Sequence, residues 1–268
     1  MHMDLSKVKM VVTDMDGTLL NSAHQVSDRF YELFKQLKER NIIFVAASGR
    51  QYNSIVDKLK PIKDDILVVA ENGGFVMQQE TELLSTPLPK AIRNQALEIV
   101  SRIDDAHAVL CGKKNAYITG DSHEFGEMLR QYYSTFDIVD SLYEVDTDIL
   151  KIAVYHAESS EAYIYPGVKH LEHALKVKVS GPNWVDLSDL QAHKGHAIAQ
   201  LQEKFGIDRS ETMVFGDYNN DLEMLGLADY SFAMANAHEN VLKAANYTTL
   251  SNDDNGVEHI LEQLIAAK

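Results

Sequence analysis

Short apolar segments alternate with segments of helical periodicity near both ends of the chain. Residues 9–13, 42–47 and 66–70 are apolar or β-branched runs of strand length, and residues 212–215 and 231–234 repeat the pattern. Amphipathic segments lie between them. Because parallel strands need long crossover connections, which are usually helices, this alternation predicts βαβ units and a doubly wound α/β domain with a parallel sheet.

Several predicted helices carry their own start and stop signals. Ser27 can cap the helix that follows the first strand, and Asn41 can adopt the left-handed conformation that ends it. Pro61 ends the next helix, and Gly206 closes the helix over residues 194–205. These signals support the helical half of the pattern.

The alternation breaks after Gly73 and Gly74 and returns near residue 190. Two strands joined by a short turn around Gly112 predict an antiparallel hairpin in this stretch. Its other predicted elements are helices through 92–103, 125–132 and 171–175 and strands at 150–154, 177–179 and 184–187. We therefore predict an α+β domain over residues 86–189, inserted into an α/β domain made of residues 1–85 and 190–268.

Composition restricts the possible partners. The chain has 268 residues and a net charge of −15, from 25 Lys and Arg against 40 Asp and Glu, which argues against non-specific nucleic-acid binding. Cys111 is the only cysteine, which excludes an intramolecular disulfide and favours a reducing compartment. The N-terminal segment lacks the apolar core of a signal peptide, and apolar runs such as 42–47 are too short to span a bilayer. We expect a cytoplasmic protein without a membrane partner.

Two aspartates follow the first predicted strand with one residue between them. Alternate side chains of a strand share a face, so Asp14 and Asp16 face one site if the strand extends that far. Carboxylates so close repel each other, and Mg²⁺ suits such a pair because it prefers oxygen ligands. A carboxylate at a strand end can also be a nucleophile that forms an acyl phosphate. The alternative is a strand followed by a solvated acidic turn.

Polar residues follow other predicted strands as well. Ser48 and Gly49 come after the second strand and offer a hydroxyl and backbone N–H groups to a phosphate. Asp217 and Asp221 follow a strand near the C-terminus, and Lys194 opens a helix, where a cation gains nothing from the helix dipole. Ligands of open α/β sheets bind at the carboxyl ends of strands, so these groups are candidates for one site. Ordinary helix capping by the serine and the acidic residues is the structural alternative.

Other candidates carry less weight. The pairs His170/His173 and His193/His196 each lie one turn apart, but no third nitrogen or sulfur ligand accompanies them, which favours solvated helix histidines over a zinc site. Cys111 lies in an apolar strand and is expected in the core. The sequence has no GxGxxG and no Walker A motif, which weakens the case for a nucleotide-cofactor fold.

Taken in order, these motifs resemble a known superfamily. Asp14-Met15-Asp16-Gly17-Thr18, Ser48, Lys194, and Gly216-Asp217 with Asn220-Asp221 resemble the four motifs of the haloacid dehalogenase (HAD) superfamily. The long insert resembles the type IIB cap of its Cof subfamily, and segments 12–18, 70–73 and 230–234 are similar to those of bacterial sugar phosphatases. The resemblance covers essentially the whole chain. It implies a Rossmann-like HAD core with an inserted α+β type IIB cap domain.

The resemblance also implies a role for each motif residue. Asp14 would be the nucleophile, and Asp16 would be the general acid and base. Mg²⁺ would be held by the Asp14 carboxylate, the Asp16 backbone carbonyl and Asp217, with Asp221 acting through water or from behind these ligands. The phosphoryl oxygens would be bound by Ser48, the amides of Met15 and Gly49, Lys194 and Asn220. Arg50, next to the serine and glycine, receives no role.

The implied activity is that of a Mg²⁺-dependent phosphatase acting on small phosphorylated metabolites. Sugar phosphates are the favoured substrates, and FMN and pyridoxal phosphate are others to consider. A phosphomutase on the same scaffold is the nearest alternative, although the sequence shows no obvious second phosphate pocket. A receiver-like signalling or phosphate-binding module is the alternative from another class, but receiver domains are shorter and lack an inserted cap. No motif identifies the physiological substrate, the cap residues that select it, or the oligomeric state.

Overall fold

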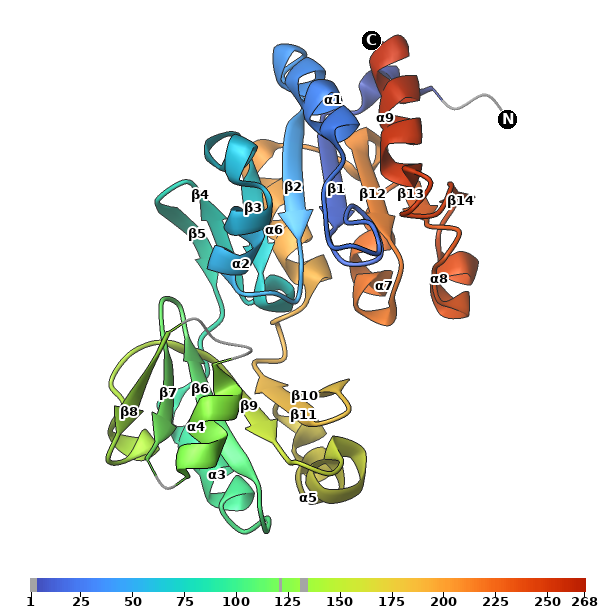
Figure 1. Cartoon of the computed structure of the whole chain (residues 1–268). Helices are drawn as coiled ribbons and strands as arrows, with labels where there is room; N and C mark the ends of the chain where they lie inside the picture. Colours follow the sequence, from blue (N-terminus) through green and yellow to red (C-terminus); the bar gives the residue numbers. More distant parts are fainter. Residues whose placement is uncertain (1–3, 121, 131–134) are drawn as a thin grey trace. The chain divides into compact units, whose positions relative to one another are not determined.

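The computed structural model describes residues 4–120, 122–130 and 135–268 (Figure 1). Its chain divides into two compact units. One contains residues up to 84 together with 193–268, and we call it the core unit. The other contains residues 85–192, and we call it the inserted unit. The sequence analysis places these boundaries one residue later at the first crossing and three residues earlier at the second.

The core unit contains an eight-stranded sheet. In spatial order its strands are β14 (Tyr247–Thr248), β13 (Tyr230–Ala233), β12 (Thr212–Gly216), β1 (Met10–Asp14), β2 (Ile43–Ala47), β3 (Leu67–Ala70), β4 (Phe75–Gln78) and β5 (Thr81–Ser85). The pairings from β14 to β3 are parallel, and β4 runs antiparallel to β3. The predicted parallel sheet is therefore confirmed, with an antiparallel edge that the prediction lacked.

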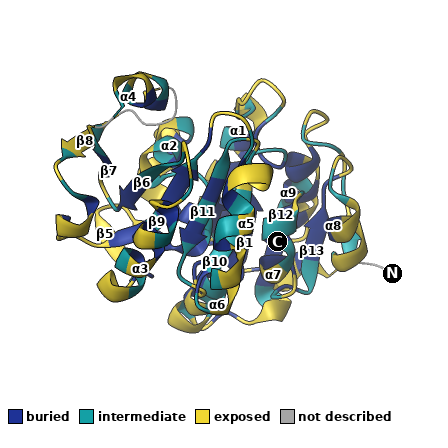
Figure 2. Ribbon diagram, turned by 90° about the horizontal axis from the view of Figure 1, so that it is seen from below, coloured by how far each residue is buried: buried dark blue, intermediate teal, exposed yellow. Residues whose placement is uncertain are grey.

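Helices cover both faces of this sheet. They are α1 (Asp28–Glu39), α2 (Tyr52–Lys58), α6 (Lys194–Phe205), α7 (Leu222–Leu225), α8 (Glu239–Ala244) and α9 (Gly256–Ala266). α1 packs beside α9, and α6 packs beside α7. β1 and β12 are buried along their whole length, and the central strands are largely dark blue in Figure 2. Burial on both faces explains the continuous apolar runs in the sequence.

The helix boundaries follow the predicted signals. The Ser27 hydroxyl accepts a hydrogen bond from the amide of Phe30 at the start of α1. Asn41 has a φ of 56° just after α1, and Gly206 has a φ of 62° at the end of α6. In these two positions the chain needs the left-handed conformation that Asn and Gly adopt most readily.

The inserted unit is built on a six-stranded sheet. Its strands, in spatial order, are β10 (Lys176–Gly181), β11 (Trp184–Ser188), β9 (Ile149–Tyr155), β6 (His107–Gly112), β7 (Ala116–Thr119) and β8 (Phe136–Val139). Pairing is antiparallel except between β7 and β8. The predicted hairpin is confirmed as β6 and β7.

Helices pack on both faces of this second sheet. Side chains of α3 (Lys90–Val100) and α5 (Tyr165–Val168) share one apolar cluster with Leu110 and Ile152. Side chains of α4 (His123–Leu129) share another with Cys111, whose thiol is buried as predicted. The unit therefore has two apolar layers and is α+β in character.

Several predictions need correction. Two strands were not predicted: β5 at the edge of the core sheet, whose residues are only partly buried or exposed, and β8 in the inserted unit, whose central residues are exposed. The predicted helix through 171–175 is a 3₁₀ helix over Lys169–His173. The predicted helix through residue 132 ends at Leu129, and residue 132 lies outside the described residues. Weakly buried elements lack the apolar periodicity on which such predictions depend.

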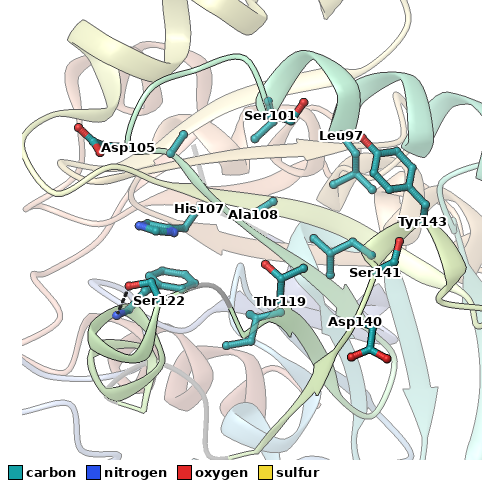
Figure 3. A pocket seen from close by; sticks show the side chains of 15 residues that line it. Leu97, Ser101, Asp105, His107, Ala108, Thr119, Ser122, Asp140, Ser141 and Tyr143 are labelled. Atoms are coloured by element: carbon teal, nitrogen blue, oxygen red, sulfur yellow. Dashed lines mark hydrogen bonds between the residues drawn. The ribbon is translucent and has the colours of Figure 1, made fainter.

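The inserted unit also has a pocket of its own, with a volume of about 490 Å³. Figure 3 shows it between the end of α3, the start of β6, the end of β7 and residues 140–143. The ring of His107 stacks on Phe125 at its wall, with 4.4 Å between ring centroids. None of the predicted site residues lines this pocket.

Candidate active site

The predicted site residues meet at the carboxyl edge of the core sheet. β1 lies between β2 and β12, and all three run parallel. β1 ends at Asp14, Ser48 directly follows β2, and Asp217 directly follows β12. Since parallel neighbours end at the same edge, the topology brings these three segments together.

Lys194 is the buried cation of this edge. It is the first residue of α6 and is 1% exposed. Its Nζ donates hydrogen bonds to Oδ1 of Asp14 at 2.5 Å and to Oδ1 of Asp221 at 2.7 Å. The lysine thus links β1 to the segment after β12.

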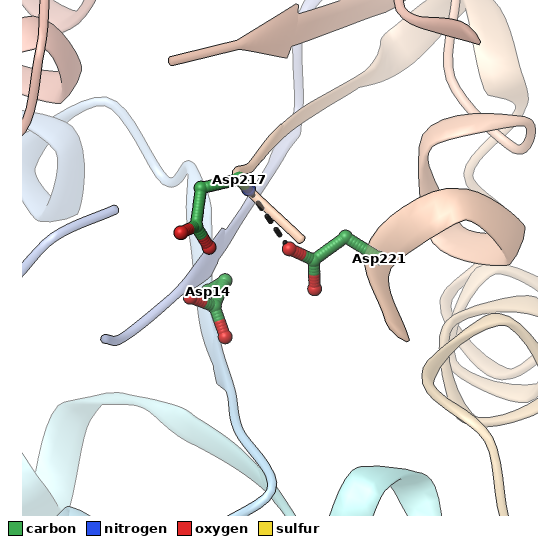
Figure 4. A group of neighbouring side chains, drawn as sticks. All are labelled: Asp14, Asp217 and Asp221. Atoms are coloured by element: carbon green, nitrogen blue, oxygen red, sulfur yellow. Dashed lines mark hydrogen bonds between the residues drawn. The ribbon is translucent and has the colours of Figure 1, made fainter. Parts of the chain in front are cut away.

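Asp221 holds that segment in a tight turn. Its Oδ2 accepts hydrogen bonds from the backbone amides of Asp217 at 2.9 Å and Tyr218 at 3.2 Å. The Thr18 hydroxyl donates to Oδ1 of Asp217 at 3.3 Å. The carboxylates of Asp14, Asp217 and Asp221 each place one oxygen within 4.8 Å of the others, and they converge in Figure 4.

Burial and mutual repulsion strongly perturb these carboxyl groups. Burial, together with the charges of Asp221 and Asp217, raises the pKa of Asp14 to about 8, although Lys194 opposes the shift. Burial and Asp221 raise the pKa of Asp217 to about 6. Burial alone would lower the pKa of Lys194, but the two carboxylates that it contacts raise it above the ordinary lysine value. The lysine therefore remains charged, while the carboxyl groups of Asp14 and Asp217 hold their protons to a higher pH than usual.

The cluster has the properties of a site for a hard divalent cation. Oδ2 of Asp14 is buried and accepts no hydrogen bond from an N–H or hydroxyl group of the described residues. The possible ligand atoms are carboxylate oxygens, which are ligands that Mg²⁺ prefers. A cation here would satisfy the buried oxygen and keep the carboxylates ionised at neutral pH. The residues therefore fit the group that the motifs imply.

Asp16 lies apart from this cluster. β1 ends at Asp14, so the alternation that would put both side chains on one face does not continue to Asp16. Its carboxylate accepts two hydrogen bonds from Arg50, Nε to Oδ2 and Nη2 to Oδ1, each of 2.6 Å. Nδ1 of His24 lies 3.3 Å from Oδ1. Burial of Asp16 tends to raise its pKa, but Arg50 and then His24 outweigh it, so the pKa is lower than usual.

The predicted phosphate-binding residues are connected through Asn72. Ser48 is buried, and its amide donates to the carbonyl of Val69 at 2.8 Å. Asn220 donates from Nδ2 to Oδ1 of Asn72 at 3.0 Å, and a Cβ on Gly49 would lie 3.0 Å from Nδ2 of Asn72. Because the backbone amide of Asn72 also donates to the carbonyl of Ser48 at 2.9 Å, Asn72 links the loops after β2 and β12.

The Met15 backbone forms the turn between the two aspartates. Its carbonyl accepts hydrogen bonds from the amides of Thr18 at 3.4 Å and Leu20 at 2.8 Å, and its side chain is fully buried. Gly17 follows with a φ of 78°, and a Cβ at this position would lie 2.2 Å from Oδ2 of Asp217. Only glycine fits there without displacing that carboxylate.

Comparison with known proteins identifies the family. Residues 11–261 match the model of the haloacid dehalogenase-like hydrolases. The chain belongs to this family. It is 31% identical over 261 residues to the 5-amino-6-(5-phospho-D-ribitylamino)uracil phosphatase YbjI of Escherichia coli, with 96% of each chain covered.

Solved structures agree with this membership of the HAD hydrolases. SMU.1108c from Streptococcus mutans is 32% identical, covers 97% of this chain and 99% of its own, and has a TM-score of 0.83. The HAD subclass IIB sugar phosphatase BT4131 is 21% identical, with 96% and 98% covered and a TM-score of 0.76, and shows the fold alone. The predicted superfamily, fold class and enzyme class, a phosphoric monoester hydrolase, are confirmed.

The sequence analysis missed two polar residues of this HAD hydrolase site. Arg50 received no role, and Asn72 was noted only as part of a similar segment. A signal for Asn72 exists, because it follows β3 at the carboxyl edge where the other strand ends were searched. For Arg50 the signal is that Asp16, a carboxylate close to Asp14 in the sequence, needs a positively charged partner.

No helix among the described residues has the length and apolar character needed to cross a bilayer.

Proposed function

We propose that this HAD hydrolase is a Mg²⁺-dependent phosphatase that acts through an aspartyl phosphate on Asp14. The observation that carries the proposal is the environment of that carboxylate. One of its oxygens is bound by Lys194, and the other is buried and has no donor among the residues that the structure describes. A carboxylate held this way at a strand end has a fixed direction for attack and a defined place for a cation.

In the first step, a carboxylate oxygen of Asp14 attacks phosphorus, and the bond from phosphorus to the substrate oxygen breaks. Asp16 gives its proton to that departing oxygen. In the second step, a water molecule attacks the phosphorus of the aspartyl phosphate and gives its proton to Asp16. The bond from phosphorus to Asp14 breaks, which releases phosphate and restores both aspartates to their starting states.

Mg²⁺ would be held by the carboxylates of Asp14 and Asp217 and by the backbone carbonyl of Asp16, with Asp221 supporting the site from behind. It supplies charge neutralisation for the nucleophile and the phosphoryl group when bound. Asp221 has one oxygen on Lys194 and the other on two amides, which suits an orienting role.

The phosphoryl oxygens would be bound by Ser48, Lys194, Asn220 and the amides of Met15 and Gly49. Asn72 accepts a hydrogen bond from Asn220 through Oδ1, and its backbone amide donates to the carbonyl of Ser48 at 2.9 Å, so one residue orders two of these phosphate-binding groups. Donors fixed before the reaction stabilise the charge that develops on the transferring group at little reorganisation cost.

We propose primary phosphate esters of sugars and related polyols as substrates. The YbjI name specifies a 5-phospho-D-ribitylamino group, and BT4131 is named a sugar phosphatase, so both names include a phosphorylated polyhydroxylated carbon chain. A cytoplasmic location belongs to the same proposal and is supported by Cys111 being the only cysteine. Neither a nucleic acid nor a membrane is proposed as a partner.

Hydrolysis of p-nitrophenyl phosphate by the purified protein tests the activity. We expect turnover with Mg²⁺, loss of turnover with EDTA, and recovery when excess Mg²⁺ is restored. A panel of sugar phosphates, 5-amino-6-(5-phospho-D-ribitylamino)uracil, FMN and pyridoxal phosphate tests the substrate class by kcat/KM. A higher kcat/KM for FMN or pyridoxal phosphate than for every sugar or ribityl phosphate would contradict the sugar assignment. Conversion of a hexose 1-phosphate to the 6-phosphate, without free phosphate, would indicate a phosphomutase.

A further inference from the structure

Arg50 is held in a fixed orientation against Asp16. Its guanidinium donates to both carboxylate oxygens, and Nη1 donates to the hydroxyl of Ser54 at 3.2 Å. Its backbone amide donates to Oγ of Ser48 at 3.1 Å, and its carbonyl accepts from the amide of Glu71 at 3.0 Å. The loop that carries the phosphate-binding serine therefore also fixes the arginine.

This pair differs from the arginine–aspartate pairs of the protein surface. The Arg50 side chain is 29% exposed, whereas Arg209, which donates through Nε to Asp229 at 2.7 Å, is 60% exposed. A planar guanidinium that donates two parallel hydrogen bonds fixes the rotation of a carboxylate as well as its position. Asp16 thus has one defined orientation, which a single contact would not impose.

The geometry also indicates which form of Asp16 is favoured by Arg50. Both oxygens accept hydrogen bonds from Arg50, which is the arrangement of a carboxylate without a proton. Two such bonds leave further lone pairs on the oxygens free to accept a proton. In the proposed cycle, Asp16 needs this form when water attacks the aspartyl phosphate.

We propose that Arg50 is a positioning residue for hydrolysis of the aspartyl phosphate. It orients the Asp16 carboxylate to take the proton from the attacking water, while the bond from phosphorus to Asp14 breaks. Cleavage of an ester with a good leaving group depends much less on Asp16, because such a leaving group departs without a proton. This inference rests on the proposed phosphatase function and assigns Arg50 to its second step.

The test is pre-steady-state kinetics of Arg50→Met with p-nitrophenyl phosphate and Mg²⁺. We expect kcat to fall about 10- to 100-fold, as for partial loss of general-base catalysis. We expect a burst of about one p-nitrophenolate per enzyme and kcat/KM within about twofold of the wild type, because kcat/KM reports the first step. In Arg50→Met, kcat for ribose 5-phosphate should equal kcat for p-nitrophenyl phosphate, because the limiting hydrolysis of the aspartyl phosphate is the same for both substrates. Arg209→Met is the matched control and should behave as the wild type.

Arg50→Lys and a rescue experiment distinguish orientation from charge or folding. Lysine keeps the charge but cannot form the two parallel bonds, so its kcat should stay at least fivefold below the wild type. Millimolar guanidinium, but not the same concentration of NaCl, should raise the kcat of Arg50→Ala. Thermal unfolding checks that each variant is folded. If Arg50→Met does not fold, the same measurements are made on Arg50→Lys.

Three results would overturn the inference. They are an unchanged kcat in Arg50→Met, a reduced kcat without a burst, and full activity in Arg50→Lys. Absence of Mg²⁺-dependent turnover in the wild-type protein would instead contradict the proposed function. The two failures are therefore distinguishable in one set of measurements.

Discussion

Among the described residues, each unit of the protein buries one long cationic side chain almost completely, and the partners of the two cations differ. Lys194 in the core unit donates to the carboxylates of Asp14 and Asp221. Arg93 in the inserted unit, 2% exposed, donates to the carbonyls of Val145 at 2.9 Å and Tyr143 at 3.3 Å. Buried charge alone therefore does not mark an active site.

The two sites differ in whether the polar atoms around the cation all have hydrogen-bond partners and whether the charges balance. Neutral carbonyls and the side chain of Asn94 occupy the Arg93 donors, which ties α3 to the 142–145 turn. Around Lys194, two carboxylates share one cation, and within the described part of the chain an oxygen of Asp14 has no donor. Uncompensated buried charge of this kind is costly to keep and is typical of functional sites. We propose that the inserted unit buries its cation for stability and that the core unit buries its cation for chemistry.

The largest expected effect follows removal of the Asp14 charge. Asp14→Asn keeps the shape of the side chain but abolishes the nucleophile, so we expect kcat to fall by at least about 10⁴-fold. Steady-state hydrolysis of p-nitrophenyl phosphate with Mg²⁺ measures this. A kcat within tenfold of the wild-type value would contradict the assignment of Asp14 as the nucleophile.

Replacing each buried cation by methionine tests the comparison directly. Lys194→Met should lower kcat/KM about 10²- to 10³-fold, because the phosphoryl group and Asp14 lose their cation. Arg93→Met should leave kcat nearly unchanged but lower the free energy of unfolding by about 2–4 kcal/mol, because two carbonyls lose their donor. Urea unfolding and steady-state kinetics of both variants provide the data. A large loss of kcat in folded Arg93→Met would break the distinction between the units.

Much of the site could be predicted because the end of a buried strand can be recognised in a sequence, where an apolar run gives way to polar residues. Asp14, Ser48 and Asp217 each follow a buried strand, and neighbouring parallel strands bring them to one edge. Lys194 stood out because a lysine at a helix N-terminus opposes the helix dipole. Its position follows from α6 beginning at that edge of the sheet.

Side-chain directions beyond the strand ends could not be predicted. The period of a strand stops with the strand, so nothing local indicated that Asp16 pairs with Arg50. Asn72 belongs to a run of three residues with positive φ, Glu71 at 50°, Asn72 at 54° and Gly73 at 99°. Sequence reasoning assigns this conformation to isolated Gly or Asn residues, and not to a run of three that begins with glutamate.

The inserted unit was less predictable for a different reason. Its outer strand β8 is weakly buried, so the apolar pattern of β8 is diluted, as it also is in β5 at the edge of the core sheet. Helical spacing over only a few residues did not distinguish the 3₁₀ segment Lys169–His173 from an α-helix. An element that buries one face has an apolar periodicity in its sequence, and an element that buries few side chains has little of this periodicity.

A smaller effect concerns the stability of the metal-free protein. Asp14 and Asp217 have pKa values of about 8 and about 6, above the ordinary value of 3.8. The folded protein therefore binds protons more tightly than the unfolded chain, and their contribution to stability is lost as the pH rises through these folded-state values. In EDTA the free energy of unfolding should fall by up to about 1.4 kcal/mol per pH unit for each group, between pH 4 and about 6 for Asp217 and between pH 4 and about 8 for Asp14.

Mg²⁺ should remove most of this loss, because it favours the ionised carboxylates, so its stabilising effect should grow with pH. Thermal unfolding at pH 5, 6.5 and 8, in EDTA or Mg²⁺, measures both trends. Asp14→Asn is the control, since asparagine does not titrate and its slope in EDTA should be shallower. A metal-free wild type that becomes more stable than this variant between pH 5 and 8 would contradict the assignment.

The smallest effects distinguish scaffold from site within the core unit itself. Gly206 has a φ of 62° with no atom within 4 Å of an added Cβ, so Gly206→Ala should cost only the backbone strain, about 1 kcal/mol. Gly17 has a φ of 78°, and its added Cβ would collide with Asp217. Gly17→Ala should therefore show a similar strain and, in addition, about tenfold weaker activation by Mg²⁺, because a displaced ligand lowers metal affinity. Urea unfolding and Mg²⁺ titration of activity measure the two components, and an equal Mg²⁺ requirement in both variants would show that Gly17 serves the fold alone.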